Sequence, residues 1–357
     1  MTNISRKIKE MGGTLLKLSP FLSFVPPLFI LYMLEPLSYE YTWKGRTYYL
    51  FFMWAVLLET ILNWNTLEIK SWKKKPYRAI IFLITLLLPT IYVLLTNFVK
   101  FWGHQNLNAL IIALARKCGV GGVNPKDVEY FTGKMPLAVE YLIFTVIFDS
   151  IILTFYGLKK MGKYALSTFL LGFIGFVYLA DNLFPYGKLM PLQMITLLTA
   201  ILASHVLNVM GYKATITTRN DPIYGFIPGL SVEGLKDPYG RPFKDSVGIA
   251  WPCSGVDSLL VYSITFLMFL KGSDFSRKQK IFFFVFGAVV TYLLNILRVI
   301  TFIMIGTTSG VGSNEWWRFH DYYGPLYSIT WIVLYPLVIT AAHSLWTRSK
   351  RRSSPSL

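Results

Sequence analysis

The stretch "IFFFVFGAVVTYLLNILRVITFIMI" (residues 281–305) decides the class of fold. It runs for 25 residues, and Arg298 is its only charged side chain. A helix of about 20 apolar residues crosses a bilayer core, so this stretch is long enough to span a membrane. A helix that starts near Ile281 carries Arg298 about 25 Å along its axis, at about 1.5 Å per residue. The stretch therefore predicts a membrane helix with a charge near one end.

The whole chain has the composition of a membrane protein. Of its 357 residues, 54% are hydrophobic and 15% are charged, against about 25% charged residues in soluble domains. The net charge of +17 comes from short basic clusters between apolar runs, which argues against nucleic acid as a partner. Cys118 and Cys253, the two cysteines, are no disulfide framework and no metal site, and no cofactor is predicted.

Nine apolar stretches alternate with basic segments along the chain. The apolar stretches lie at residues 21–39, 47–64, 79–100, 137–157, 165–183, 190–209, 254–270, 281–305 and 325–345. The five basic segments are the N-terminus, 65–78, 158–164, 271–280 and the C-terminal tail. The positive-inside rule places all five in the cytoplasm, which requires an even number of spans. One of the nine stretches must therefore not cross.

The stretch "MPLQMITLLTAILASHVLNV" (residues 190–209) is the one that we predict does not cross. Its polar residues recur at spacings of three to five and roughly mark one helical face; they are Gln193, Thr196, Thr199, Ser204 and Asn208. That pattern is typical of an amphipathic helix lying in the membrane interface. An ordinary span with a few polar residues is the alternative.

We therefore predict an all-α polytopic membrane protein with about eight transmembrane helices, one interfacial amphipathic helix and a small outer β-hairpin. β-rich pieces separated by turn residues place the hairpin near residues 212–235. Residues 1–164 are expected to hold four spans and an outer insertion at 101–136, to which no role is assigned. Residues 165–357 are expected to hold the functional core, with four spans and an outer loop at 210–252. The two parts are expected to form one membrane domain with both termini in the cytoplasm.

Cys253 stands at the outer end of the sixth predicted span, in "WPCSGVDSLL" (residues 251–260). Pro252 suits the first turn of a helix, where its missing N–H is not needed. The partial positive charge of a helix N-terminus lowers the pKa of a thiol, which favours a nucleophile. A small apolar cysteine that only packs at this position is the alternative.

Arg298 and His320 are expected at the same membrane face as Cys253. A charge within a span usually faces the protein interior or marks a functional site, although Arg298 could also snorkel to head groups or pair with Asp257. His320 lies in "WWRFHDYYGPLYS" (residues 316–328), the connector into the eighth span. Histidine transfers protons near neutral pH, whereas many loop histidines are only solvated.

A cysteine, a histidine and an arginine at one site can carry out acyl transfer. The thiolate attacks a peptide carbonyl, the imidazole protonates the leaving amine as a general acid, and the guanidinium stabilises the oxyanion. The residues alone leave open which group deprotonates the thiol. They also leave an alternative from a different class, an intramembrane serine protease with Ser254 or Ser258 as its nucleophile.

Two carboxylates within predicted spans suggest a third class. Glu59 and Asp149 are ionisable groups of the kind that a proton-coupled transporter uses. The sequence holds no inverted repeat and no matching pair of broken spans, so a transporter is less favoured. Asp149 is instead expected to be an internal partner for a polar group.

Three motifs, "PCSGVDSLL", "LLNILRVI" and "HDYYG", resemble the Cys-Ser-Gly, Asn-x-x-Arg and His-x-x-x-Gly signatures of the exosortase/archaeosortase family. The resemblance covers roughly residues 165–345, with the motifs in the family's order. It implies a membrane-embedded cysteine transpeptidase or protease with Cys253 as nucleophile, Arg298 as oxyanion stabiliser and His320 as acid/base. Some archaeal members carry an arginine at the third position, which makes Arg318 a reserve candidate.

The same resemblance implies the partners and the location. Family members act on exported proteins that end in a short motif, a membrane helix and a basic tail. They pass the acyl group to an acceptor, which can be a membrane lipid bearing an amine. The active site is then expected at the outer face of the cell membrane, where the hairpin near 212–235 could pair with the substrate peptide edge-on.

Overall fold

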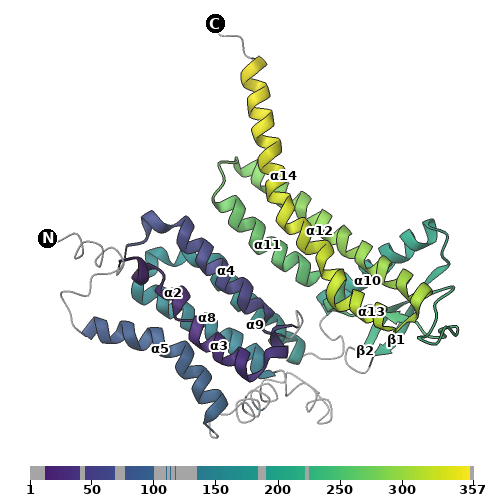
Figure 1. The fold of residues 1–357 in the computed structure, drawn as a ribbon, viewed down its shortest axis with the longest axis horizontal. Helices are drawn as coiled ribbons and strands as arrows, with labels where there is room; N and C mark the ends of the chain where they lie inside the picture. The colour runs from purple at the N-terminus through teal and green to yellow at the C-terminus, as the bar shows by residue number, and fades with distance from the viewer. Residues whose placement is uncertain are drawn as a thin grey trace. The chain divides into compact units, whose positions relative to one another are not determined.

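The computed structural model describes residues 13–40, 45–68, 77–99, 135–183, 190–221 and 225–353, together with residues 110, 113 and 117 (Figure 1). The chain divides into two compact units, Met1–Phe184 and Pro185–Leu357. Cys118 and nearly all of the predicted insertion 101–136 lie outside the described residues. The predicted division into residues 1–164 and 165–357 stays a prediction.

The N-terminal unit is a bundle of apolar helices. Its elements are α2 (Ser19–Leu22), α3 (Val25–Leu34), η1 (Pro36–Tyr39), α4 (Thr47–Leu62), η2 (Trp64–Thr66), α5 (Tyr77–Phe98), α8 (Met135–Phe155), η4 (Leu158–Tyr164) and α9 (Ala165–Leu183). Helix α8 packs against α5 and α9, and α4 packs against α9. A Cβ on Gly175 would lie 2.9 Å from Leu142 Cγ, so a glycine is needed where α9 meets α8. Small residues let membrane helices approach in this way.

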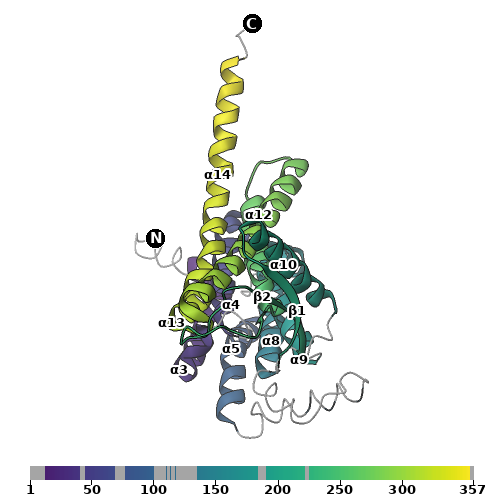
Figure 2. The same cartoon turned by 90° about the vertical axis from the view of Figure 1, so that its right-hand side faces the viewer.

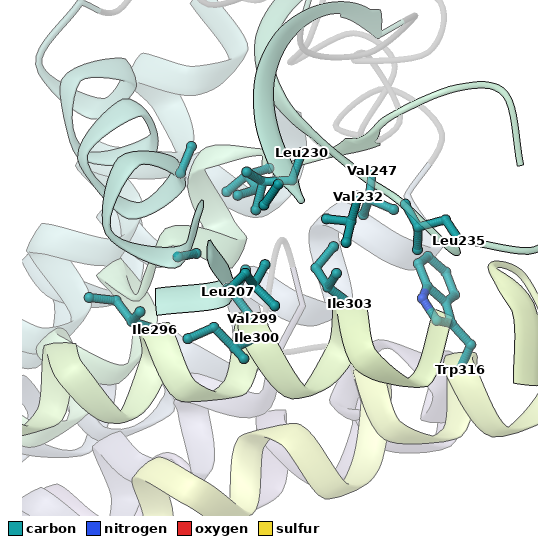
Figure 3. Close-up of a cluster of buried hydrophobic side chains, with 14 residues drawn as sticks. Leu207, Leu230, Val232, Leu235, Val247, Ile296, Val299, Ile300, Ile303 and Trp316 are labelled. Atoms are coloured by element: carbon teal, nitrogen blue, oxygen red, sulfur yellow. The ribbon is translucent and has the colours of Figure 1, made fainter. Parts of the chain in front are cut away.

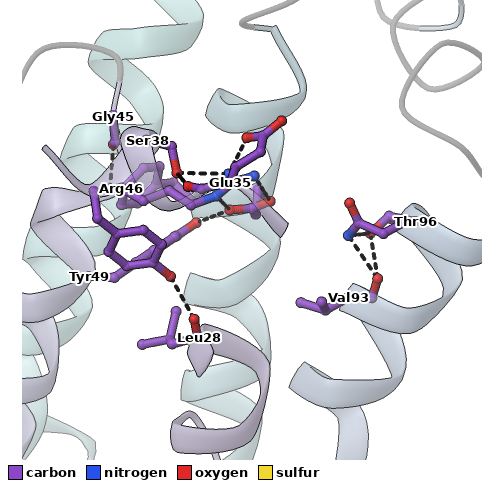
Figure 4. A network of polar contacts seen from close by, with 12 residues as sticks. Leu28, Glu35, Ser38, Gly45, Arg46, Tyr49, Val93 and Thr96 are labelled. Atoms are coloured by element: carbon purple, nitrogen blue, oxygen red, sulfur yellow. Dashed lines mark hydrogen bonds and ion pairs between the residues drawn. The ribbon is translucent and has the colours of Figure 1, made fainter. Parts of the chain in front are cut away.

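A buried ion network joins the start of α4 to α8 in this unit (Figure 4). Arg46 donates through Nε and Nη2 to both carboxylate oxygens of Glu140, at 2.9 and 3.0 Å. Arg46 is 6% exposed and Glu140 is fully buried. Arg46 Nη1 also donates to Glu35 at 2.6 Å, and the Tyr49 hydroxyl donates to Glu140 at 2.9 Å. A buried charge requires partners of this kind, although no sequence motif pointed to these residues.

The two intramembrane carboxylates noted in the sequence both accept hydrogen bonds from α9. Glu59 is fully buried and accepts from the backbone N–H of Ser167 at 3.1 Å and from its hydroxyl at 2.8 Å. It therefore caps the first turn of α9 from α4. Asp149 accepts from the Thr168 hydroxyl at 2.6 Å, which confirms that it is an internal partner for a polar group. These structural roles weaken the argument for a proton-coupled transporter.

The C-terminal unit combines long helices with a small sheet. Its elements are α10 (Met190–Val209), β1 (Ala214–Asp221), β2 (Gly225–Val232), β3 (Val247–Gly248), η5 (Trp251–Ser254), α11 (Val256–Lys271), α12 (Arg277–Ile305), η6 (Gly306–Gly310), α13 (Asn314–Arg318), η7 (Phe319–Tyr323) and α14 (Gly324–Ser353). Helices α11, α12 and α14 pack on one another, side by side in Figure 1. Gly287 lets Tyr262 and Tyr335 approach α12, where their hydroxyls each donate to a backbone carbonyl at 2.8 Å.

The predicted hairpin is present and is extended by a third strand. The sheet is antiparallel in the order β1-β2-β3, with Ala214 opposite Val232 and Gly229 opposite Gly248. Strands β1 and β2 pack against α10, as Figure 2 shows from the side. Leu230 and Val232 enter a buried apolar cluster with α12 residues such as Ile303 (Figure 3). This core ties the sheet to the helix that carries Arg298.

Helix α10 differs in one respect from its prediction. Thr196 and Thr199, expected on a face turned to the interface, are 1% and 0% exposed, whereas Met194 and Ile201 are 72% and 45% exposed. The hydroxyl of Thr199 donates to the Ile195 carbonyl at 3.0 Å and has further partners inside the unit. Buried polar groups need such partners, so the helix turns an apolar side outward.

Within the described residues, five helices are long and apolar enough to cross a membrane. They are Ala79–Phe98, Leu137–Phe155, Leu158–Leu179, Arg277–Gly310 and Asn314–His343, and shorter apolar helices lie at Ser19–Leu34, Thr47–Leu62 and Met194–Val209. The predicted class, a mostly helical protein with several membrane helices and a small antiparallel hairpin, is confirmed. The number of eight spans stays a prediction.

Candidate active site

Cys253 lies just before a sharp turn that leads into α11. It belongs to the short 3-10 helix η5, and α11 begins only at Val256, so Pro252 stands in the first turn of η5 instead of α11. Gly255 links the two with φ +97°, a conformation that L side chains rarely adopt. A Cβ on Gly255 would also lie 3.0 Å from the Asn295 amide. Both constraints explain the glycine of the Cys-Ser-Gly motif.

The structure brings Cys253 and His320 together. Cys253 Sγ lies 3.6 Å from His320 Nε2, although the two residues are 67 positions apart. His320 comes from η7, a π-helical turn between α13 and α14. Its ring lies beside Phe302, with centroids 5.1 Å apart, and is nearly parallel to the buried Trp316 ring at 6.4 Å. These rings hold the imidazole against the thiol.

Asp321 is a member of this group that the sequence analysis missed. Its Oδ1 lies 2.7 Å from His320 Nδ1. A carboxylate there accepts from Nδ1–H, which leaves Nε2 to face the sulfur. Consecutive residues of a regular helix do not face each other, so adjacency in "HDYYG" predicts no contact. Both residues lie in the π-helical turn η7, and such turns are frequent at functional sites.

Arg298 is anchored beside the same histidine. Its Nη2 donates to the backbone carbonyl of His320 at 3.1 Å. A Cβ on Gly324 would lie 2.7 Å from Arg298 Nε and 3.0 Å from the Phe319 carbonyl oxygen. The glycine of the His-x-x-x-Gly motif therefore makes room for the guanidinium where α14 begins. The three residues singled out in the sequence thus lie in one site.

The surroundings of Cys253 favour its thiolate. Burial raises the pKa of the thiol, but the hydrogen bond with His320 and the positive charges of His320 and Arg298 lower it by more. Asp257, in the first turn of α11, acts weakly in the opposite direction. The resulting thiol pKa lies below its ordinary value. A low thiol pKa is typical of nucleophilic cysteines.

The reserve candidates occupy other places. The Ser254 hydroxyl is fully buried and donates to the Trp251 carbonyl at 2.6 Å. The exposed Arg318 places its guanidinium 5.5 Å from the centre of the Tyr323 ring. Across the described ranges, no group of three or more His, Cys, Asp or Glu side chains could hold a metal ion. Of Cys253 and Ser254, only the cysteine side chain lies against a histidine in the described residues.

No curated protein and no solved structure matches the chain. A family model described as transmembrane exosortase (Exosortase_EpsH) matches residues 43–337. This match begins well before the region 165–345 that the motifs indicated, and it contains Cys253, Arg298 and His320. It also starts just before α4, so most of the N-terminal unit is included. The chain is therefore a multi-pass membrane protein of the transmembrane exosortase family.

Proposed function

We propose that this protein is a membrane-embedded cysteine transpeptidase that cleaves C-terminal sorting signals of exported proteins through a thioester on Cys253. The observation that carries the proposal is the 3.6 Å contact between Cys253 Sγ and His320 Nε2. The lowered pKa of the Cys253 thiol supports it, and membership of the exosortase family agrees with a sorting-related enzyme.

The acylation step uses these residues as follows. The Cys253 thiol passes its proton to His320 Nε2, and the thiolate sulfur bonds to the carbonyl carbon of the scissile peptide bond. The carbonyl oxygen becomes an oxyanion, which the Arg298 guanidinium stabilises. The C–N bond then breaks, and the leaving amine takes the proton from His320 Nε2. The upstream protein is left as a thioester on Cys253.

The second step transfers the protein to an acceptor. An amine, which we propose is borne by a membrane lipid, attacks the thioester carbonyl and gives a proton to His320 Nε2. The C–S bond breaks, and the thiolate leaves with that proton available to restore the thiol. Asp321 holds the Nδ1–H tautomer throughout, so that Nε2 serves as acceptor and donor in turn. Water in place of the amine would give hydrolysis.

The site is proposed to lie at the outer face of the cell membrane, with both termini in the cytoplasm and eight helices crossing. Each of the eight predicted spans coincides with an apolar helix or a pair of short consecutive helices in the structure. Trp317, Tyr322 and Tyr323 are 50%, 65% and 42% exposed around His320. Exposed aromatic side chains of this kind gather at membrane–water interfaces.

The substrate is proposed to arrive as an extended segment next to its own membrane helix. Strand β1 is an edge of the sheet, so its outer edge is a surface on which such a segment can add as a further strand. The hairpin also contributes Leu230 and Val232 to the core of the unit. Its deletion would therefore disturb folding, and edge substitutions are the better probe.

The proposal is tested with an exported protein of the same host that ends in a short motif, a membrane helix and a basic tail. We expect Cys253→Ala to abolish its processing and Cys253→Ser to lower it severely, because the thiolate is the nucleophile. Ser254→Ala is the matched control for a serine-type enzyme and should keep processing. Equal membrane accumulation of all variants is checked in parallel. Undiminished processing by Cys253→Ala overturns the proposal.

A further inference from the structure

The backbone around the nucleophile is held by side chains from two helices. Asn295 Nδ2, on α12, donates to the carbonyl of Cys253 at 3.1 Å. Thr199 Oγ1, on α10, lies 3.3 Å from the carbonyl oxygen of Ser254 and 2.9 Å from the Tyr292 hydroxyl, and its one proton is shared between the Ser254 carbonyl and that of Ile195, at 3.0 Å. Thr199 and Asn295 are both fully buried. The consecutive backbone carbonyls of Cys253 and Ser254 are therefore contacted by side chains from α12 and α10.

These hydrogen bonds restrict the direction in which the Cys253 thiol points. A peptide group is planar, so fixing one carbonyl fixes the plane of the peptide bond that contains it. Fixing the carbonyls of Cys253 and Ser254 leaves little freedom in the backbone that carries the sulfur. The sulfur–imidazole contact is already 3.6 Å long, so a small rotation of the turn would lose it.

The Asn295 amide has a second feature that a purely structural residue would not need. Its Oδ1 is buried and has no hydrogen-bond partner among the described residues. Because Nδ2 must face the Cys253 carbonyl, the amide cannot turn over to satisfy that oxygen. A buried acceptor without a partner destabilises a fold, so the favourable contact that this amide makes among the described residues is the Nδ2 bond to the Cys253 carbonyl.

We propose that Thr199 and Asn295 are positioning residues that hold the Cys253 turn so that its sulfur meets His320. The proposal rests on the transpeptidase function proposed above, and it adds α10 to the parts of the protein that govern the reaction. Tyr292 completes the arrangement, because its hydroxyl can donate to Thr199 Oγ1 and leave the Thr199 proton for the Ser254 and Ile195 carbonyls. The charged and titratable groups that face the thiol remain His320, Arg298 and Asp257.

The test replaces the Thr199 hydroxyl without changing the size of the side chain. Thr199→Val should lower kcat for processing about tenfold with little change in KM, since misplacing a reacting group by about 1 Å can cost 100-fold. Thr199→Ser should restore the rate to within about twofold, because it keeps the hydroxyl. Thr291→Val is the matched control: Thr291 is equally buried and donates to the carbonyl of its own helix, at Gly287, at 2.7 Å.

A second measurement does not depend on the substrate. The rate at which iodoacetamide alkylates Cys253 is followed against pH in detergent-extracted, folded protein. Thr199→Val and the uncharged Asn295→Leu should raise the midpoint pH, because the thiolate loses its contact with His320, whereas Thr291→Val should leave it unchanged. If Thr199→Val does not accumulate, Tyr292→Phe replaces it in both measurements. Unchanged midpoints in these variants overturn the proposal even where Cys253→Ala abolishes processing, which separates its failure from that of the proposed function.

Discussion

The two units of the molecule each bury a polar cluster, and the clusters differ in how completely their charged or reactive groups are bonded. In the N-terminal unit, both oxygens of Glu140 accept from Arg46, and all three guanidinium nitrogens of Arg46 donate. In the C-terminal unit, the Cys253 sulfur has a long contact to His320, and Asn295 keeps an unpartnered oxygen among the described residues. In the first cluster the charged groups are bonded to one another, whereas in the second the Cys253 sulfur has only the contact to His320 and the buried Asn295 oxygen has no partner among the described residues.

This difference separates structural from functional polar groups in a membrane protein. An ionisable residue inside a membrane is a functional candidate by default. Arg46, Glu59 and Glu140 are exceptions, because each is bound by neighbouring elements that it holds in place. Three predictions test the contrast, beginning with the largest expected effect.

Glu140→Leu should cost the most stability. It leaves the Arg46 guanidinium buried without its main partner, which is expected to lower the free energy of unfolding by about 3–5 kcal/mol. Thermal unfolding in detergent, with equal protein loading, measures this loss. The double variant Arg46→Met with Glu140→Leu should recover much of it, because no uncompensated charge remains. A loss below about 1 kcal/mol for Glu140→Leu would show that water reaches the cluster.

Arg298→Gln should lower processing about 10²- to 10³-fold, the effect expected when a group that stabilises an oxyanion is removed. Arg318→Gln is the matched control and should stay within about twofold, because an exposed surface charge contributes little. Both variants are compared at equal membrane abundance on the same substrate. A larger loss in Arg318→Gln than in Arg298→Gln would transfer the role to the reserve candidate.

The smallest expected effect is a change in pH dependence. The pKa of the Cys253 thiol lies below its ordinary value, so alkylation in the wild type should reach half its maximal rate below the pH expected for an ordinary thiol. His320→Ala should move that midpoint upward, since burial still raises the thiol pKa while the hydrogen bond that lowers it is gone. Asp321→Asn should move it in the same direction by less, because Asp321 acts through His320.

The control for this pH series is His205→Ala. His205 is an exposed histidine of α10 in the same unit, and its removal should leave the midpoint in place. Equal midpoints for the wild type and His320→Ala would mean that the imidazole does not govern the thiol.

Sequence patterns predicted where the helices and the hairpin lie, but they did not predict which buried side chains contact one another. Each predicted span coincides with helix, and the hairpin near 212–235 is present. The polar residues of α10 were expected to face the interface, but Thr199 turns inward to reach Ser254, 55 positions away. The periodic pattern shows that one face of the helix is polar. It does not show whether that face lies against water or against buried hydrogen-bond partners inside the protein.

The candidate site shows the same limit. Cys253, Arg298 and His320 could be named in advance because their side-chain chemistry is rare near the end of an apolar run. Asp321 could not, because its contact with His320 depends on the directions of two adjacent side chains, which no local sequence pattern predicts. The motifs alone do not explain why glycine is needed at positions 255 and 324. The close neighbours of Gly255 and Gly324 in the structure explain it.

The sequence alone determined that this chain crosses membranes, because a long apolar helix satisfies its own backbone hydrogen bonds in lipid, and long apolar runs are visible in local composition. It also determined which reactive residues the chain possesses. Only the tertiary structure decided which polar groups meet, as with Arg46 and Glu140 across 94 positions or Asn295 and Cys253 across 42. Such pairings depend on distances of a few ångströms between elements far apart in the chain, and those distances are set by how side chains of separate helices pack.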